Sequence, residues 1–425
     1  MTVMTETENA GVDADAGTAG GVGAVRGTAL FVAAIVGPGI LTLPALAAAE
    51  AGPASLVALG LLLALSAPIA FTFAGLSRAA PGAQGVAGYA AAAFGPLTGR
   101  LVSAWFRYGV PVGIPALGLI GGEYVAAATG GGEPTAVVVA AGICAVAVVA
   151  SVRHRAGSGV LTLALTVLLV LLVVVTAVVA LPHSRAEHLT PFAPGGYVAV
   201  AASALVLTWV LTGWEAVTNF TGVLRDPRRS LPRVTTATLV IVAVLYAAVA
   251  IPEILVLGPT AGGSEAPVAA MLRVAVGPAG AAVAALIAVV IAVGTTLAWV
   301  GSLAELGTGT RSTTRERAPR SARTDALVVP VLIMVASLAA AAVTPIGTRE
   351  LVSLCAGSQV PVYVVGLAAG IRLLPSLGRS WWLAVLATAV VAILLVAAGP
   401  YLLVPAVIAV GVTARHLVQR RPTGA

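Results

Sequence analysis

The stretch Gly37-Pro38-Gly39-Ile40-Leu41 lies inside the first long apolar segment of the chain. Glycine and proline side by side break a helix, because one lacks a Cβ and the other lacks an N–H. At membrane depth, a break is tolerated only where the freed backbone is buried in protein or lines a cavity. A second break, Thr208 to Glu215 (TWVLTGWE), falls in the sixth apolar segment. Two interrupted spans, five segments apart, predict a transporter with its substrate site at the bilayer midplane.

The composition places the chain in the membrane. Of its 425 residues, 59% are hydrophobic and 9% are charged, and the mean hydropathy is +1.04. Soluble domains carry about 25% charged residues, and an apolar run of about 20 residues spans the hydrocarbon layer. The chain has no Lys, and its net charge of +7 comes from arginines that flank the apolar runs. This charge therefore indicates membrane topology and excludes nucleic acid as a partner.

The apolar runs predict an all-α membrane protein with about 12 transmembrane helices. The expected spans are roughly 27–49, 54–77, 97–126, 134–151, 158–181, 197–221, 234–257, 280–308, 326–343, 348–371, 380–398 and 400–417. With the N-terminus inside, most arginines fall in cytoplasmic loops, and only Arg185, Arg273 and Arg349 lie outside. Basic residues favour the cytoplasmic side, so we expect a multi-pass protein of the cell membrane with both termini cytoplasmic.

Five regions follow from this pattern. Residues 1–24 are polar and acidic and are expected to form a disordered cytoplasmic tail. Residues 25–181 and 182–372 would each supply five helices, 373–418 would form helices 11 and 12, and 419–425 would form a cytoplasmic tail. Two loops stand out: a basic run at 311–323, and a Pro- and Gly-containing turn at 81–89 that leads into a short interfacial helix ending near Phe94.

Each break suits one charged end of an amino acid. A broken helix leaves N–H groups at the start of one half and C=O groups at the end of the other. The N–H groups suit a carboxylate and the C=O groups suit an ammonium. A simple kink in a packed helix is the alternative interpretation. The expected substrate-binding residues are Ile35, Gly37, Gly39, Ile40, Leu41, Trp209, Thr212 and Gly213.

Three further side chains are candidates for gating or coupling. Trp209 could close over a bound substrate, or it could pack against protein or lipid. Glu215 is the acidic residue deepest in an apolar span, where a charge is costly unless it is paired, hydrated or protonated. It could couple transport to protons or serve as a structural partner. Arg107 also needs a partner inside the third span; Glu215 is preferred over Glu305.

Span eight carries two adjacent hydroxyl side chains, Thr295 and Thr296. They could help to bind Na⁺, although threonine more often bonds back to its own helix. In span three, Gly118 and Gly122 are spaced for close packing against another helix. The four His and two Cys form no metal-ligand spacing, so we expect no metal and no cofactor.

The chain resembles the amino acid–polyamine–organocation permease superfamily. The motifs that resemble it are Gly37-Pro38-Gly39-Ile40-Leu41 with Pro44, Trp209 with Gly213-Trp214-Glu215-Ala216, the loop Asp226 to Arg233, and Pro81 to Val86. Within the superfamily the chain is similar to the bacterial methionine and branched-chain amino acid exporter group. The segments that carry this similarity are Pro81 to Ala87, Ala93-Phe94-Gly95 and Val110 to Ala116.

The resemblance implies a LeuT-like fold, with two inverted five-helix repeats, helices 1 and 6 unwound at the midplane, and two extra helices. It also implies alternating access, with Trp209 as the gating aromatic. Pro38 departs from the family pattern, since many members have Ser, Thr or Ala there, and proline removes one N–H donor.

These observations predict a secondary transporter of neutral, aliphatic or methionine-like amino acids, with efflux preferred and H⁺ as the expected coupling ion. Apolar residues near the breaks (Val110, Ile114, Leu211 and Leu297) suit aliphatic substrates. The alternative within transport is a proton-coupled importer or exchanger. An enzyme would need a polar catalytic cluster that the sequence lacks. A channel predicts uncoupled conductance, and a receptor predicts binding without flux.

Overall fold

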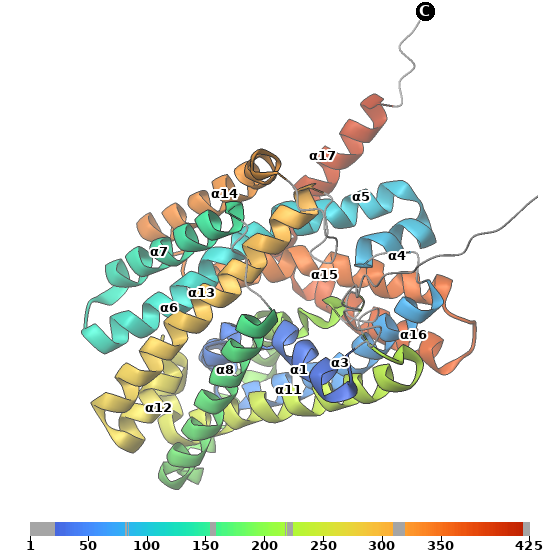
Figure 1. Ribbon diagram of the computed structural model, residues 1–425. Helices are drawn as coiled ribbons and strands as arrows, with labels where there is room; N and C mark the ends of the chain where they lie inside the picture. Colours follow the sequence, from blue (N-terminus) through green and yellow to red (C-terminus); the bar gives the residue numbers. More distant parts are fainter. Residues whose placement is uncertain are drawn as a thin grey trace, which may run out of the picture.

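The computed structural model describes residues 22–80, 83, 85–153, 159–216, 218, 224–308 and 319–419. Most of the two expected tails (1–21 and 420–425), most of the basic loop 311–323, and Pro81, Gly82 and Gln84 of the turn lie outside these residues. The described chain is almost wholly helical, and its long helices lie side by side in one bundle (Figure 1).

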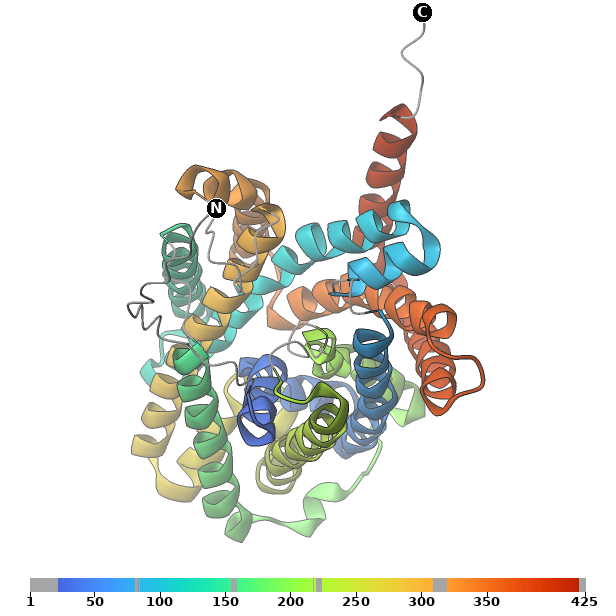
Figure 2. The same ribbon diagram turned by 45° about the vertical axis from the view of Figure 1, so that its right-hand side comes forward.

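The helices follow one another with short connections. In chain order they are α1 (Ala24–Ile35), η1 (Pro38–Leu41), α2 (Leu43–Ala51), α3 (Ser55–Ala79), α4 (Gly85–Phe94), α5 (Pro96–Ala104), η3 (Trp105–Gly109), α6 (Val110–Thr129), α7 (Gly132–Val152) and α8 (Gly159–Ala180). They continue with α9 (Gly196–Leu207), η6 (Thr208–Leu211), η7 (Trp214–Ala216), α11 (Pro227–Leu257), η9 (Gly258–Gly263), α12 (Pro267–Val276), α13 (Pro278–Thr308), α14 (Arg320–Val343), α15 (Thr348–Leu373), α16 (Arg379–Ala397) and α17 (Leu403–Gln419). The last of these stands out from the bundle in two views (Figures 1 and 2).

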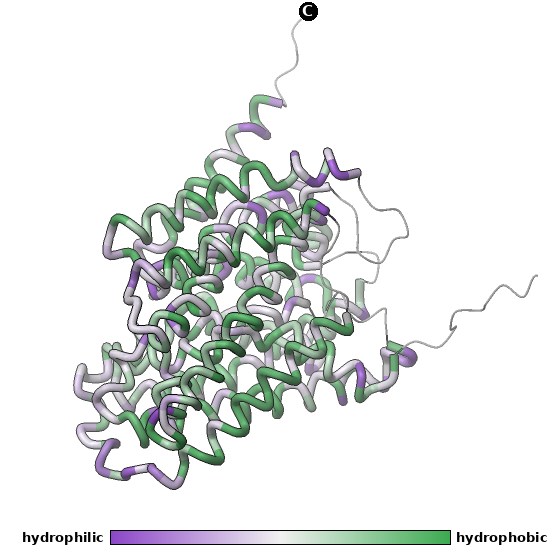
Figure 3. The backbone as a smooth tube through the Cα atoms, turned by 60° about the vertical axis from the view of Figure 1, so that its left-hand side comes forward, coloured by the Kyte–Doolittle hydropathy of each residue, from purple (hydrophilic) through white to green (hydrophobic). Residues whose placement is uncertain are grey.

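The long helices have the length and apolarity of membrane spans. Ten helical segments of the described residues meet both criteria. Their middles are hydrophobic and their ends are more hydrophilic (Figure 3). The segments Ala24–Ile35 and Gly196–Leu211 are shorter apolar pieces. The chain is therefore a multi-pass membrane protein, while the count of twelve spans stays a prediction.

The first span is interrupted where Gly37-Pro38-Gly39 stands. Helix α1 ends at Ile35, and Val36 and Gly37 are extended, with ψ angles of 107° and −170°. A short 3₁₀ turn, η1, follows, and α2 then resumes from Leu43. Proline begins η1 because it has no N–H to satisfy at the start of a helix. The local sequence thus accounts for the interruption of this span.

The sixth segment is interrupted in another way. Helix α9 gives way to η6, Thr212 is extended, and Gly213 has a φ of 102°. This left-handed region strongly favours glycine. A Cβ on Gly213 would lie 2.8 Å from the Ala34 carbonyl oxygen and 2.9 Å from Ile35 Cα. The two interruptions therefore touch, and Gly213 is what permits the contact.

Small residues let the helices around the site approach closely. A Cβ on Gly113 would meet the Cys355 sulfur at 2.8 Å, so α6 lies tightly against α15. A Cβ on Gly118 would meet the Ala140 carbonyl oxygen at 3.1 Å, and Gly122 faces the Ala136 backbone in the same way. The packing role predicted for Gly118 and Gly122 is confirmed, with α7 as the neighbouring helix.

A short strap joins the start of the first span to the loop after the second interruption. Val22 forms a β-bridge with Leu224, and the Arg225 N–H donates to the Val22 carbonyl at 3.1 Å. Gly27 of α1 packs against the Leu224 side chain, since a Cβ there would lie 2.7 Å from Leu224 Cδ2. This strap lies at the end of the bundle that carries Arg26, Arg78, Arg225, Arg320, Arg372 and Arg379, called here the arginine-rich end.

Candidate substrate site

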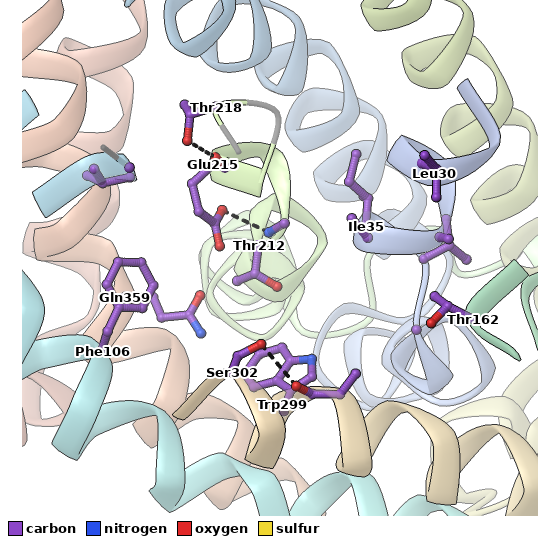
Figure 4. A pocket seen from close by; sticks show the side chains of 18 of the residues that line it. Leu30, Ile35, Phe106, Thr162, Thr212, Glu215, Thr218, Trp299, Ser302 and Gln359 are labelled. Atoms are coloured by element: carbon purple, nitrogen blue, oxygen red, sulfur yellow. Dashed lines mark hydrogen bonds between the residues drawn. The ribbon is translucent and has the colours of Figure 1, made fainter. Parts of the chain in front are cut away.

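A cavity of about 1850 Å³ lies between the two interrupted spans and reaches the arginine-rich end. Its inner part is lined by residues of α1 and η1, by the segment from Trp209 of η6 to Glu215 of η7, and by residues of α8, α13 and α15 (Figure 4). Arg225, Asp226 and Pro375 line it near the surface, and all three are exposed. The cavity is therefore open to solvent at this end.

The first interruption presents peptide groups to this cavity. The N–H groups of Gly37 and Gly39 donate to no backbone carbonyl among the described turn and loop contacts. Both glycines line the cavity. Ala33, Ala34 and Ile35 also line the cavity, and their carbonyls accept no hydrogen bond from the described turns and loops. One stretch of chain thus offers both donors and acceptors.

The second interruption is held together by side chains. The Gly213 N–H donates to Glu215 Oε2 at 2.9 Å. Tyr363 of α15 donates its hydroxyl to the Leu211 carbonyl at 2.6 Å, and it also contacts Glu215 Oε2. Thr212 donates both its N–H and its hydroxyl to the Trp209 carbonyl, at 3.1 and 2.7 Å. The peptide groups that this break frees are therefore largely satisfied within the protein.

Aromatic and amide side chains line the cavity near Glu215. Trp209 is 7% exposed, and its ring lies edge-on to Trp299 of α13, with centroids 6.0 Å apart. Phe106 and Gln359 come from α5–α6 and α15, and the Gln359 amide points into the space between Glu215 and Trp299 (Figure 4). Gln359 Nε2 donates to Cys355 Sγ at 3.5 Å, while its Oε1 is buried without a partner.

Most of the residues expected from the sequence border this one cavity. They are Ile35, Gly37, Gly39, Trp209, Thr212, Gly213 and Glu215. Ile40 and Leu41 do not line it, and both are fully buried. Thr295 lines it opposite Gly37, whereas the Thr296 hydroxyl is buried without a partner. The roles of these residues stay predictions.

The partner expected for Arg107 is corrected by the structure. Arg107 Nη2 donates to the Ala326 carbonyl of α14 at 3.0 Å. The ion pairs among the described residues do not include Arg107 with Glu215 or Glu305. Arg107 lies in η3, a π-helical turn, which inserts an extra residue and changes the direction of the side chains. Glu215 meanwhile bonds Gly213 and Tyr363, so the pair preferred from sequence is not formed.

Sequence reasoning missed the contribution of α15. Gln359 and Tyr363 are four residues apart, and side chains with this spacing share one helix face. An amide and a phenol on one face of an apolar span could have indicated a residue pair at the site, because polar groups within a membrane face the interior of the bundle. Their link to the second break needed tertiary structure.

The end opposite the arginine-rich end is closed. Tyr124 of α6 donates its hydroxyl to the Leu41 carbonyl at 2.9 Å. Thr348, at the start of α15, donates to Glu123 of α6, and Arg349 forms an ion pair with Glu50 of α2. These contacts join α2, α6 and α15 beyond the cavity. The structure is therefore open at one end and sealed at the other.

A bundle with two interrupted spans around a cavity open at one end is the architecture of a secondary transporter. The crystal structure of MhsT in complex with L-phenylalanine has the same overall fold. Its TM-score is 0.57 at 14% identity, and the match covers 90% of this chain and 100% of that one. The fold is LeuT-like, as expected from the sequence.

The family model described as "Amino acid permease" matches residues 22–306, so the chain belongs to the amino acid permease family of the amino acid–polyamine–organocation superfamily. Members of this family are transporters, not enzymes. The uncharacterized amino acid permease YecA of Bacillus subtilis (strain 168) is 27% identical over 396 residues, which are 91% of this chain and 92% of the relative.

Two further relatives match about half of the chain. The L-methionine/branched-chain amino acid exporter YjeH of Escherichia coli (strain K12) is 29% identical over 227 residues, or 53% of this chain and 54% of the exporter. The b(0,+)-type amino acid transporter 1 of Oryctolagus cuniculus is 31% identical over 256 residues, or 56% of this chain and 52% of the relative.

Proposed function

We propose that this chain exports neutral amino acids with aliphatic or methionine-like side chains across the cell membrane by alternating access, with H⁺ as the coupling ion. The observation that carries the proposal is the set of peptide groups that the first break leaves free in the cavity wall. The N–H groups of Gly37 and Gly39 suit a carboxylate, and the carbonyls of Ala33 to Ile35 suit an ammonium.

The walls around these groups favour an uncharged substrate. Leu30, Val110, Ile291 and the Trp209 and Trp299 rings border the cavity, so a substrate side chain would meet apolar surface. An apolar side chain gains from leaving water there, by about 25 cal/mol per Å² of buried area. The name of the Escherichia coli relative supports the choice of methionine and branched-chain amino acids and the choice of efflux.

Glu215 is the proposed coupling residue. Tyr363 has one hydroxyl proton but two acceptors in reach, the Leu211 carbonyl and Glu215 Oε2. When Tyr363 donates to Leu211, its contact with Glu215 is a hydrogen bond only if the carboxyl carries a proton and donates it. A proton on Glu215 therefore fits the geometry around the second break. Its release would change the hydrogen bonds that Tyr363 makes with Leu211 and Glu215.

Trp209 is the proposed gate between substrate and the open end, and Arg107 the proposed gating residue on that side. With both termini cytoplasmic, the arginine-rich end faces the cytoplasm, and the described conformation is the one that receives substrate from inside. Export then requires that the opposite end open while the cavity closes. The same site would serve an importer or exchanger, since the gradients determine the direction of flux.

Transport by the purified protein in liposomes tests the proposal. Vesicles are loaded with labelled leucine or methionine, and a pH gradient is imposed in either direction. We expect saturable flux of both amino acids, driven by the proton gradient and inhibited by other neutral amino acids but not by lysine or glutamate. Conductance without coupling, or binding without flux, would contradict transport. Flux without a response to pH would support transport but contradict H⁺ as the coupling ion.

A further inference from the structure

Glu253 is a buried carboxyl group that the substrate site does not use. It lies on α11, about one turn before the helix ends at Leu257, at the closed end of the bundle. Its relative exposure is 0%, and neither of its carboxylate oxygens has a hydrogen-bond partner. Glu123 Oε2 is also buried without a partner. Among the described residues, these three are the only unpartnered buried carboxylate oxygens.

One tyrosine lies near both glutamates. The Tyr124 hydroxyl donates to the Leu41 carbonyl and accepts a bond from the Val268 N–H of α12 at 3.3 Å. The charges of Glu253 and Glu123 both affect the Tyr124 hydroxyl electrostatically. Leu41 belongs to η1, the turn inside the first interruption. Tyr124 therefore joins α6 and α12 at the closed end to the backbone of η1.

The charged and titratable groups on neighbouring elements leave Glu253 without a counter-ion. His188 bonds the Leu255 carbonyl at 2.8 Å, and Arg185 pairs with Glu187 at 3.6 Å. Arg349 pairs with Glu50, Arg273 donates to the Ala127 carbonyl, and His183 of η4 is exposed at the surface. The remaining charge near the cluster, that of the exposed Glu265, is negative. No described cation is therefore placed to neutralise Glu253.

An ionised carboxylate in such a place costs far more than a neutral one, because desolvation is not repaid by any partner. A metal cation would need several oxygen ligands. The described residues contain no group of three His, Cys, Asp or Glu side chains that could hold one. A proton needs only one oxygen. The chemistry of the pocket therefore favours a carboxylic acid over a carboxylate.

We propose that Glu253 is a second proton-binding site, which is occupied when this end of the molecule is closed and releases its proton when the end opens. This inference rests on the proposed proton-coupled transport. Opening would admit water, and the carboxylic acid would then give its proton to solution and become a carboxylate. Closing would take one proton back. Tyr124 is the positioning residue that links this step to Leu41.

The test compares Glu253→Gln with Glu265→Gln, its matched control, in reconstituted vesicles. Glutamine has the shape of the protonated acid and no titratable proton, so Glu253→Gln is expected to fold and to exchange labelled leucine. Because Glu253 takes its proton from the closed-end side and returns it there, low pH on that side should favour the closed end. The exchange rate of wild type should therefore change by up to about tenfold per pH unit on that side, and Glu253→Gln should lose this dependence. Glu265→Gln removes an exposed charge from the same region and should keep the wild-type dependence on the pH of that side.

A direct readout is the infrared absorption of protonated carboxyl groups. We expect wild type to show a component of this band that appears as the pH on the closed-end side falls. Glu253→Gln should lack this component and keep any component that comes from Glu215. Tyr124→Phe should keep the band but shift the pH at which it appears. A permanent band at every pH, or a Glu253→Gln variant that keeps the wild-type dependence on the pH of the closed-end side, would overturn the second site.

These outcomes are distinguishable from a failure of the proposed function. If wild type transports leucine without any response to pH, both the coupling ion and this site are wrong. If wild type responds to pH and Glu253→Gln responds equally, only this site is wrong. If Na⁺ drives the flux and Glu253→Gln abolishes that effect, the site binds Na⁺ and the proton assignment is overturned.

Discussion

The two interrupted spans reach similar shapes by opposite means. In the first, Gly37-Pro38-Gly39 breaks the helix by itself, and the N–H groups of Gly37 and Gly39, which line the cavity, have no backbone partner. In the second, Glu215 and Tyr363 bond the freed groups. One break is therefore available to a ligand, while the other is braced by α15. The proposed function assigns substrate binding to the first break and proton coupling to the second.

Gly213→Ala should have the largest effect on transport, because the added Cβ would push the second break away from the first. A residue with a side chain costs about 1–2 kcal/mol in the left-handed region, and the new Cβ would meet the backbone of α1. We expect transport to fall by at least about tenfold, and the melting temperature to fall as well. Gly142→Ala is the control, since it lies in α7 with open space around it. Equal activity of the two variants would contradict the contact.

Glu215→Gln and Tyr363→Phe test the brace of the second break. Tyr363→Phe leaves the buried Leu211 carbonyl without its donor, which costs about 1–3 kcal/mol. Because both residues meet at one oxygen, the double variant should lose less stability than the sum of the two single variants, by about 0.5–3 kcal/mol. Chemical unfolding of the four proteins measures this difference. Strict additivity would show that the two side chains act independently.

Trp209→Ala should weaken substrate binding more than it slows exchange. The ring borders the cavity and packs edge-on to Trp299, so its loss removes apolar contact from both. We expect the Kd for leucine to rise by about tenfold, or about 1.4 kcal/mol, with Trp209→Phe in between. Trp382→Ala of α16, whose side chain is largely exposed, is the matched control. An unchanged Kd would place Trp209 outside the binding surface.

Pro38→Ala should have the smallest effect, and it should strengthen binding. It restores an N–H between Gly37 and Gly39, and one added hydrogen bond contributes about 0.5–1.5 kcal/mol. We expect the Kd for leucine to fall by a few-fold in calorimetry. The unfolded chain also gains freedom without proline, so stability should drop slightly. Weaker binding by a fully folded Pro38→Ala variant would show that the substrate carboxylate does not lie against η1.

The sequence predicted the fold and the first break well, because both depend on local chemistry. Apolar runs define the helices, and Gly37-Pro38-Gly39 breaks one wherever it stands. The side-chain contacts across the bundle were harder to predict. The Arg107–Glu215 pair was wrong because a π turn redirects Arg107, and Tyr363 was missed because it approaches Glu215 from a helix 148 residues further along. Such contacts depend on helix rotation, which hydropathy does not determine.

The strap between Val22 and Leu224 has a mechanical consequence. A peptide hydrogen bond joins the chain just before α1 to the chain just after the second interruption. Two segments tied at the membrane surface cannot swing apart without first losing that bond. We therefore expect the two segments to move together as one rigid body when the cavity changes the side to which it opens. Their rotation would then cross one free-energy barrier.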